Sequence, residues 1–192
     1  ENCIGVASGL DALIMAIDAF GFPKGSEIIV PSNTYIATIM AIIRNGFVPV
    51  LVEPAIESYN IDTERIEEKI SNQTVAILVV HLYGKSCKMD KVVMIARQYN
   101  LEIIEDCAQA HGARYRGRLV GTLGDVAAFS TMYGKHHATG AQGGIVYTRN
   151  PSIFVRAKQT ADRGKPFGAV ISKPSYVTAS LNFNQDELGM AI

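Results

Sequence analysis

One lysine of this sequence has surroundings that single it out for chemistry. Lys135 follows Ser130 by five residues and lies in a stretch rich in glycine, where the backbone must approach something closely. A lysine held in a dry site can lose its proton and form a Schiff base with an aldehyde. We expect the other lysines to be solvated surface charges, as most lysines are. Lys135 is therefore the candidate nucleophile of the chain.

An acidic residue stands directly behind an apolar run. Asp106 follows Leu101–Ile104 and Glu105, so its carboxylate would lie at the edge of a sheet, where a charge must be paired or solvated. An isolated aspartate at such a place more often caps the next turn, here Cys107–Ala110. A functional aspartate there would pair with a cationic ring nitrogen and keep it protonated.

A third candidate is an anion site at the start of a helix. Ser8 and Gly9 precede an amphipathic stretch, and the free amides and positive dipole end of that helix would hold a phosphate. The commoner role of such a serine is a helix N-cap and nothing more. Further polar groups follow other predicted strands: Asn33, Thr34, Tyr35, His81 and Gln109. The four histidines lack metal-ligand spacing, so we predict no metal site.

The elements that must position these groups alternate along the chain. Apolar runs predict strands at Glu27–Val30, Val48–Val52, Val75–Val80, Leu101–Ile104, Val126–Ser130 and Ile145–Thr148. Amphipathic spacing predicts helices at Asp11–Phe20, Thr34–Arg44, Thr63–Ile70, Met89–Tyr99 and Pro151–Asp162. The remaining predictions are a hairpin of Ala113–Tyr115 with Arg118–Val120, a long loop at Arg163–Ser180 and the start of a helix at Leu181–Ile192. This alternation indicates a doubly wound α/β fold, in which ligands bind beyond the carboxyl ends of the strands.

The composition excludes several classes of function. Because 18 Lys and Arg balance 18 Asp and Glu, we expect no electropositive face for nucleic acid. No apolar run approaches the ~20 residues that span a bilayer. Cys3, Cys87 and Cys107 form no CxxC pair, which predicts no disulfide framework or zinc site and indicates a reducing compartment, the cytoplasm. Because the GxxxxGK[ST], GxGxxG, HExxH and GxSxG motifs are missing, nucleotide hydrolysis, classical dinucleotide oxidoreduction and zinc proteolysis have no support.

The motifs together resemble the pyridoxal-phosphate-dependent sugar aminotransferases of the DegT/DnrJ/StrS type, within fold type I. The stretches that carry the resemblance are Ala7–Leu13, Pro31–Thr38, Val80–Gly84, Ile104–Gly112, Ala128–Ser130 with Lys135, and Asn182–Leu188. They occur in collinear order over nearly the whole chain. Members of this family are about twice as long, so we expect residues 1–192 to be the large, cofactor-binding domain. The N-terminal segment and the C-terminal small domain would then be missing.

The resemblance implies a three-layer α/β/α large domain with a mostly parallel sheet and pyridoxal 5′-phosphate (PLP) as cofactor. It implies that Lys135 binds the cofactor as a Schiff base and then moves the substrate's proton. Asp106 would pair with the pyridine nitrogen, Gln109 would lie near the ring hydroxyl, and Tyr35 would stack on the ring face. The residues that it places around the phosphate are Ser8, Gly9, Leu10, Ser130 and, reaching a neighbouring subunit of a homodimer, Asn182.

The activity that the resemblance implies is transfer of an amino group from glutamate or glutamine to a keto sugar linked to a nucleotide. Two alternatives stay open. One is a regulatory or non-catalytic protein that keeps the PLP pocket. The other is a PLP-dependent sugar dehydratase, since a branch of the family has histidine at the lysine position and His136 is one residue away. The sequence departs from the common pattern at Leu10, Gln142 and Asn184, where threonine, an acid and arginine are more usual.

Overall fold

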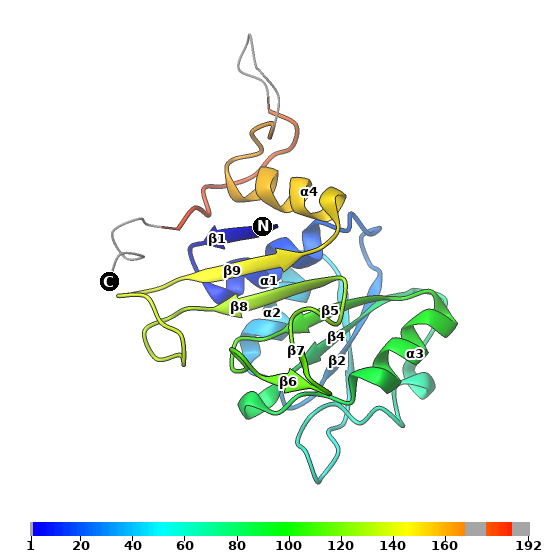
Figure 1. Cartoon of the computed structure of the whole chain (residues 1–192). Helices are drawn as coiled ribbons and strands as arrows, with labels where there is room; N and C mark the ends of the chain where they lie inside the picture. Colours follow the sequence, from blue (N-terminus) through cyan, green and yellow to red (C-terminus); the bar gives the residue numbers. More distant parts are fainter. Residues whose placement is uncertain (1, 168–175, 186–192) are drawn as a thin grey trace.

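The computed structural model describes residues 2–167 and 176–185, and its centre is a seven-stranded sheet (Figure 1). In spatial order the strands are β1 (Cys3–Val6), β9 (Gly144–Thr148), β8 (Val126–Ser130), β5 (Glu102–Asp106), β4 (Thr74–Val80), β2 (Glu27–Pro31) and β3 (Val48–Val52). The pairs from β8 to β3 are parallel, whereas β9 runs antiparallel to both β8 and β1. The predicted α/β fold with a mostly parallel sheet is confirmed.

Helices cover both faces of this sheet. α1 (Gly9–Asp18), α2 (Ile36–Arg44) and α4 (Pro151–Ala161) pack into one apolar cluster, and α3 (Met89–Tyr99) packs into a second. Figure 1 shows α3 on the opposite side of the sheet from α1 and α2. The arrangement is therefore three layers, helix on sheet on helix.

Strand β4 explains the apolar run that predicted it. Leu78 and Val80 belong to the cluster under α1 and α2, while Ile77 and Val79 belong to the cluster under α3. Successive side chains of a strand point to opposite faces, and here both faces are covered. The strand consequently shows no alternation of apolar and polar residues.

The predicted hairpin is present beside the main sheet. β6 (Arg114–Tyr115) and β7 (Arg118–Leu119) pair antiparallel, and both residues between them have positive φ, 47° at Arg116 and 82° at Gly117. Two left-handed residues in succession are what a tight two-residue hairpin turn requires.

Two sequence-based expectations differ from the structure, and one strand has no counterpart among them. Thr63–Ile70 is not an α-helix but a set of turns with one 3₁₀ turn at Glu67–Lys69, because two apolar positions in eight residues give a helix too little buried surface. Strand β1 was not predicted, since it has only four residues. The described part of Leu181–Ile192 is extended: Asn182 and Asn184 form isolated bridges with Asp162 and Val6.

Other predictions fall partly outside the described ranges. Residues 186–192 of the predicted C-terminal helix and 168–175 of the predicted loop are among these. The described parts of that loop, 163–167 and 176–180, contain turns and no helix or strand longer than a bridge. No helix in the described residues is long and apolar enough to cross a membrane.

Candidate active site

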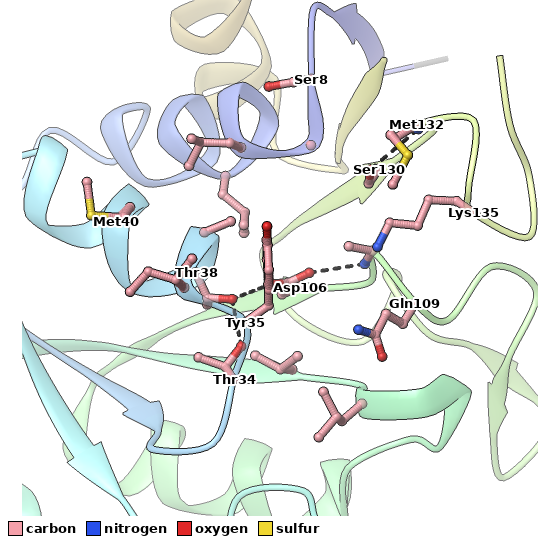
Figure 2. Close-up of a pocket in the computed structure, with 18 of the residues that line it drawn as sticks. Ser8, Thr34, Tyr35, Thr38, Met40, Asp106, Gln109, Ser130, Met132 and Lys135 are labelled. Carbon is pink, nitrogen blue, oxygen red and sulfur yellow. Dashed lines mark hydrogen bonds between the residues drawn. The ribbon is translucent and has the colours of Figure 1, made fainter. Parts of the chain in front are cut away.

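A cavity of about 630 Å³ opens at the carboxyl ends of the parallel strands, beside the first turns of α1 and α2 (Figure 2). Eight of the nine residues predicted for the site line it: Ser8, Gly9, Leu10, Tyr35, Asp106, Gln109, Ser130 and Lys135. They come from four separate segments of the chain, residues 8–10, 35, 106–109 and 130–135. The fold therefore brings together what the sequence places up to 127 residues apart (135 − 8).

Asp106 lies at the floor of the cavity, where β5 ends. Only 5% of it is exposed, and each of its oxygens accepts one hydrogen bond. The amide of Ala108 donates to Oδ1 at 3.0 Å, and the Thr38 hydroxyl donates to Oδ2 at 2.9 Å. Burial raises the pKa of Asp106, while these two hydrogen bonds and the positive charge of Lys135 act against that rise. The Asp106 carboxylate is therefore buried and fixed in position to pair with a cation that enters the cavity.

Lys135 reaches the cavity from the loop between β8 and β9. Because these two strands are antiparallel neighbours, the loop is a hairpin, closed by hydrogen bonds from Thr131 N–H to the Gly143 carbonyl and from Tyr133 N–H to the Ala141 carbonyl, both about 2.8–2.9 Å. The amide of Lys135 donates to the carbonyl of Met132 at 2.8 Å, which fixes its backbone. Figure 2 shows the Lys135 side chain extended toward Asp106 and Gln109.

The side chain of Gln109 has a fixed orientation. Its Oε1 accepts a hydrogen bond from the amide of Tyr83 at 2.9 Å. Tyr83 is a non-glycine residue in the left-handed region, with φ of 54°, so this bond also helps to hold a strained turn. With Oε1 engaged, the Nε2 group is the part of Gln109 that is available as a donor in the cavity.

The first turn of α1 and the end of β8 form a cradle for an anion. Ser8 is an N-cap, as its position suggests: its hydroxyl accepts from the Asp11 amide at 3.1 Å and donates to the Asp11 carboxylate at 2.6 Å. Helix geometry then leaves the amides of Gly9 and Leu10 without an intrahelical acceptor. A Cβ on Gly9 would lie 2.6 Å from the Cβ of Ser130, so only glycine permits this approach.

This cradle fits a phosphate ester. Ser130 is 7% exposed, and its hydroxyl lies beside the first turn of α1, at the positive end of the helix dipole. With Asp106 for a ring cation and Lys135 for an aldehyde, the polar groups match the three functional parts of PLP. The Ser8 hydroxyl is engaged by Asp11, so the groups of this turn that can reach a phosphate are its backbone amides.

Tyr35 and apolar side chains complete the wall of the cavity. Tyr35 precedes the first turn of α2 and is 71% exposed, and Figure 2 shows its ring edge-on beside Asp106. Leu13, Ile36 and Met40 form much of the apolar lining. A flat ring lying over Asp106 would contact Tyr35 on one face.

Asn182 is the predicted site residue that does not line the cavity. It is exposed, its backbone pairs with Asp162, and its Oδ1 accepts from the side-chain amide of Asn184 at 2.9 Å. Within the described residues, therefore, Asn182 makes no contribution to the cavity of its own chain.

His81, also singled out at a strand end, lies below the cavity and not in it. It is fully buried, and its Nε2 is 3.0 Å from Glu105 Oε2 while its Nδ1 accepts from the Cys87 amide. Glu105 also accepts from the amides of Gly121, Leu123 and Gly124. Burial alone would raise the pKa of Glu105, but the hydrogen bonds from His81 and these amides outweigh it and the pKa is lowered.

His81 and Glu105 also approach Cys107, all three with ligand atoms within 4.8 Å of one another. Both nitrogens of His81 and both oxygens of Glu105 already have partners, and burial holds the pKa of the Cys107 thiol well above its ordinary value. This cluster is therefore a closed hydrogen-bonded network that stabilises the ends of β4 and β5.

Sequence reasoning named Thr34 among the polar groups after a strand, but it missed Thr38 and the hydrogen bonds that join the two threonines to Asp106. Thr34 and Thr38 hydrogen-bond to each other at 2.7 Å, and Thr38 continues to Asp106. The signal available was their spacing of four residues at the start of a helix, which places two hydroxyls on one face. Nothing in the sequence joins that face to an aspartate 68 residues away.

The chain also matches known proteins over nearly its whole length. The sequence model of the DegT/DnrJ/EryC1/StrS aminotransferase family matches residues 1–191. The chain belongs to this family. It is 50% identical over 192 residues to a dTDP-3-amino-3,6-dideoxy-alpha-D-galactopyranose transaminase of Aneurinibacillus thermoaerophilus, covering 100% of this chain and 52% of that protein.

Solved structures of DegT/DnrJ/EryC1/StrS relatives share the fold. S. venezuelae DesV in complex with a ketimine intermediate aligns with a TM-score of 0.91 and 40% identity, over 98% of this chain and 50% of that one. NtdA of Bacillus subtilis with bound cofactor PMP aligns with a TM-score of 0.89 and 30% identity, over 98% of this chain and 42% of that one. The chain thus spans about half the length of the relatives it matches.

Proposed function

We propose that the protein is a PLP-dependent aminotransferase that transfers an amino group from glutamate or glutamine to a keto sugar linked to a nucleotide. The observation that carries the proposal is the meeting of Lys135, Asp106 and the Gly9–Ser130 cradle in one cavity. The relatives named as dTDP-sugar transaminases support the nucleotide-sugar part. The reduced and buried Cys87 and Cys107 suit a cytoplasmic protein.

The protein's contribution to cofactor binding begins at the phosphate. The amides of Gly9 and Leu10 and the Ser130 hydroxyl donate to its oxygens, and the positive end of α1 favours its negative charge. Gln109 Nε2 donates to the ring hydroxyl, and Tyr35 stacks on the ring. Together these residues would hold the cofactor in one orientation relative to Asp106 and Lys135.

Asp106 and Lys135 supply the charge and the proton transfer. PLP, when bound, acts as an electron sink that stabilises a carbanion next to an amine. Asp106 maintains that property because its buried carboxylate pairs with the ring nitrogen and keeps it protonated. Lys135 Nζ would hold the cofactor aldehyde and, as a free amine, would act as the base that takes a proton from the donor and the acid that gives one to the sugar carbon.

We further propose that the site is completed in a homodimer. The outward face of α2 exposes Ile36, Met40 and Ile43 next to the mouth of the cavity, a run of apolar side chains that a partner subunit would cover. Asn182 lies outside its own cavity, which is consistent with a contact to the phosphate of a neighbouring subunit.

The proposal is tested by the visible absorption spectrum of the full-length protein with PLP, before and after borohydride, followed by peptide mapping. We expect an absorption band that borohydride removes and a reduced adduct on Lys135. Lys135→Ala should lose both, whereas Lys69→Ala, a change at an exposed lysine, should keep both. A folded protein with no band, or an adduct on another residue, contradicts the proposal.

Turnover separates the proposal from the two alternatives. Glutamate or glutamine should convert bound PLP to pyridoxamine phosphate; a protein that binds PLP and never makes this conversion is a regulatory binder. For the dehydratase alternative, the acting residue would be a histidine. Lys135 lines the cavity and the exposed His136 does not, which favours amino transfer.

A further inference from the structure

The carboxylate of Asp106 is held at both ends by groups from different elements. Thr38, in the first turn of α2 and 1% exposed, donates to Oδ2, and the amide of Ala108 in the turn after β5 donates to Oδ1. A carboxylate oxygen can accept two hydrogen bonds. One acceptor position on each oxygen is therefore used to fix the group, and the other remains for a ligand in the cavity.

The two threonine hydroxyls form a chain with a direction. Thr34 Oγ1 and Thr38 Oγ1 are 2.7 Å apart, and Thr38 has a single hydrogen. When that hydrogen goes to an ionised Asp106, the hydrogen between the two threonines must come from Thr34. The order Thr34 to Thr38 to Asp106 is thus set by the negative charge at its end, and each hydrogen bond in such a chain strengthens the next.

We propose that Thr38, supported by Thr34, is a positioning residue that holds Asp106 ionised and correctly oriented for the ring nitrogen of the cofactor. This inference rests on the proposed function, in which Asp106 pairs with that nitrogen. If this buried position served packing alone, valine would fill it equally well, because valine has the same shape as threonine and no buried hydroxyl that needs a hydrogen-bond partner. The position in the first turn of α2 adds the positive end of a nine-residue helix to the donors around the carboxylate.

The test compares Thr38→Val with Thr38→Ser in the full-length protein. Valine keeps the volume and removes the donor, while serine keeps the donor. We expect Thr38→Val to weaken PLP binding by about tenfold to a hundredfold, the contribution of a hydrogen bond to a charged group. Thr38→Ser should stay within about threefold of the wild type, on the same scale.

A second ligand distinguishes positioning from simple structural damage. Deazapyridoxal phosphate, in which CH replaces the ring nitrogen, cannot form the pair with Asp106. Thr38→Val should therefore leave the dissociation constant of this analogue unchanged while that of PLP rises. Equal losses for the two ligands, or no loss for PLP, overturn the inference.

The support from Thr34 is tested by a double-mutant cycle. Thr34→Val alone should weaken PLP binding by at least about twofold, and in a Thr38→Val background it should have no further effect, because the chain is already broken. Additive effects contradict the coupling. Thr34 is only partly buried, so we expect Thr34→Val to fold. Its effect on PLP binding then tests the inference even if Thr38→Val does not fold.

Failure of the proposed function gives a different result from failure of this inference. If the wild-type protein binds neither PLP nor the analogue, the proposed function is wrong and the inference falls with it. If the wild type binds PLP and the Thr38 variants do not discriminate between the two ligands, only the inference is wrong.

Discussion

The contact between Gly9 and Ser130 makes a quantitative prediction about phosphate binding. Gly9 does not have positive φ, so glycine is required here for proximity and not for backbone conformation. In Gly9→Ala the new Cβ would lie 2.6 Å from Ser130 Cβ and 3.1 Å from Ser130 Cα. Carbon atoms prefer separations of about 3.5–4.0 Å, so the first turn of α1 and the end of β8 must move apart by about 1 Å.

That displacement acts on the two sides of the phosphate cradle. A hydrogen bond to a charged group contributes about 1.5–3 kcal/mol, and a shift of this size removes about one such bond. PLP binding should therefore weaken by about tenfold to a hundredfold. Overpacking should also lower the stability of the cofactor-free protein by about 1–3 kcal/mol.

The assay is the dissociation constant of PLP and of pyridoxal, which lacks the phosphate, for wild type and Gly9→Ala. Pyridoxal binding should change by less than about threefold, since its contacts are at the ring. Gly5→Ala is the matched control: its Cβ would meet the Gln185 side chain, with Oε1 at 3.0 Å and Cβ at 3.8 Å, and, among the described residues other than its chain neighbours, no backbone atom within 4 Å. Unchanged PLP binding in a folded Gly9→Ala protein, or an equal loss for both ligands, would refute the reasoning.

Further predictions concern the network below the cavity, the ring hydroxyl and the cysteines. Glu105→Gln should destabilise the protein by about 1–3 kcal/mol near neutral pH, because a side-chain amide has one acceptor oxygen for the hydrogen bonds that the carboxylate takes from His81 and three backbone amides. Since the folded pKa of Glu105 is lowered, the wild type has this stability above the ordinary value of 4.5 and loses it as pH falls through the folded pKa, so urea melts of the two proteins should converge in acid. Gln109→Leu should shift the absorption band of bound PLP and weaken binding by about tenfold, whereas Gln109→Glu should weaken it further by placing a charge beside the phenolate. Burial raises the pKa of Cys87 to about 12, so a thiol reagent at pH 8 should label exposed Cys3 and spare Cys87 until the protein is unfolded.

Residues whose role depends on local sequence were predictable. Val75–Val80 indicated a strand because both faces are buried, and Asp106 and Lys135 stood out because polar groups after such strands gather at one sheet edge. Helix α1 was placed within two residues, since Ser8 caps it in the way its type and position suggest. These features are determined by neighbours in the chain.

Residues whose role depends on distant contacts were not predictable. The Thr38 hydroxyl reaches a carboxylate only because the fold places Asp106 beside it. His81 looked like a cavity residue, yet the buried carboxylate of Glu105 holds it on the opposite side of the strand end. The periodicity of Thr63–Ile70 was real, since Ile66 is fully buried, but its packing against the α3 cluster did not require an α-helix.

The reversed direction of β9 has a consequence for how this active site can be altered. Where strands are parallel, a loop at the sheet edge leads into a crossover helix, and changing its length disturbs that helix. Residues 131–143 instead return directly to the neighbouring strand, so the segment that carries Lys135 has both ends anchored in one strand pair. An engineer could transplant this segment between homologues at constant length without moving a helix, provided that its contact between His137 and His111 is matched as well.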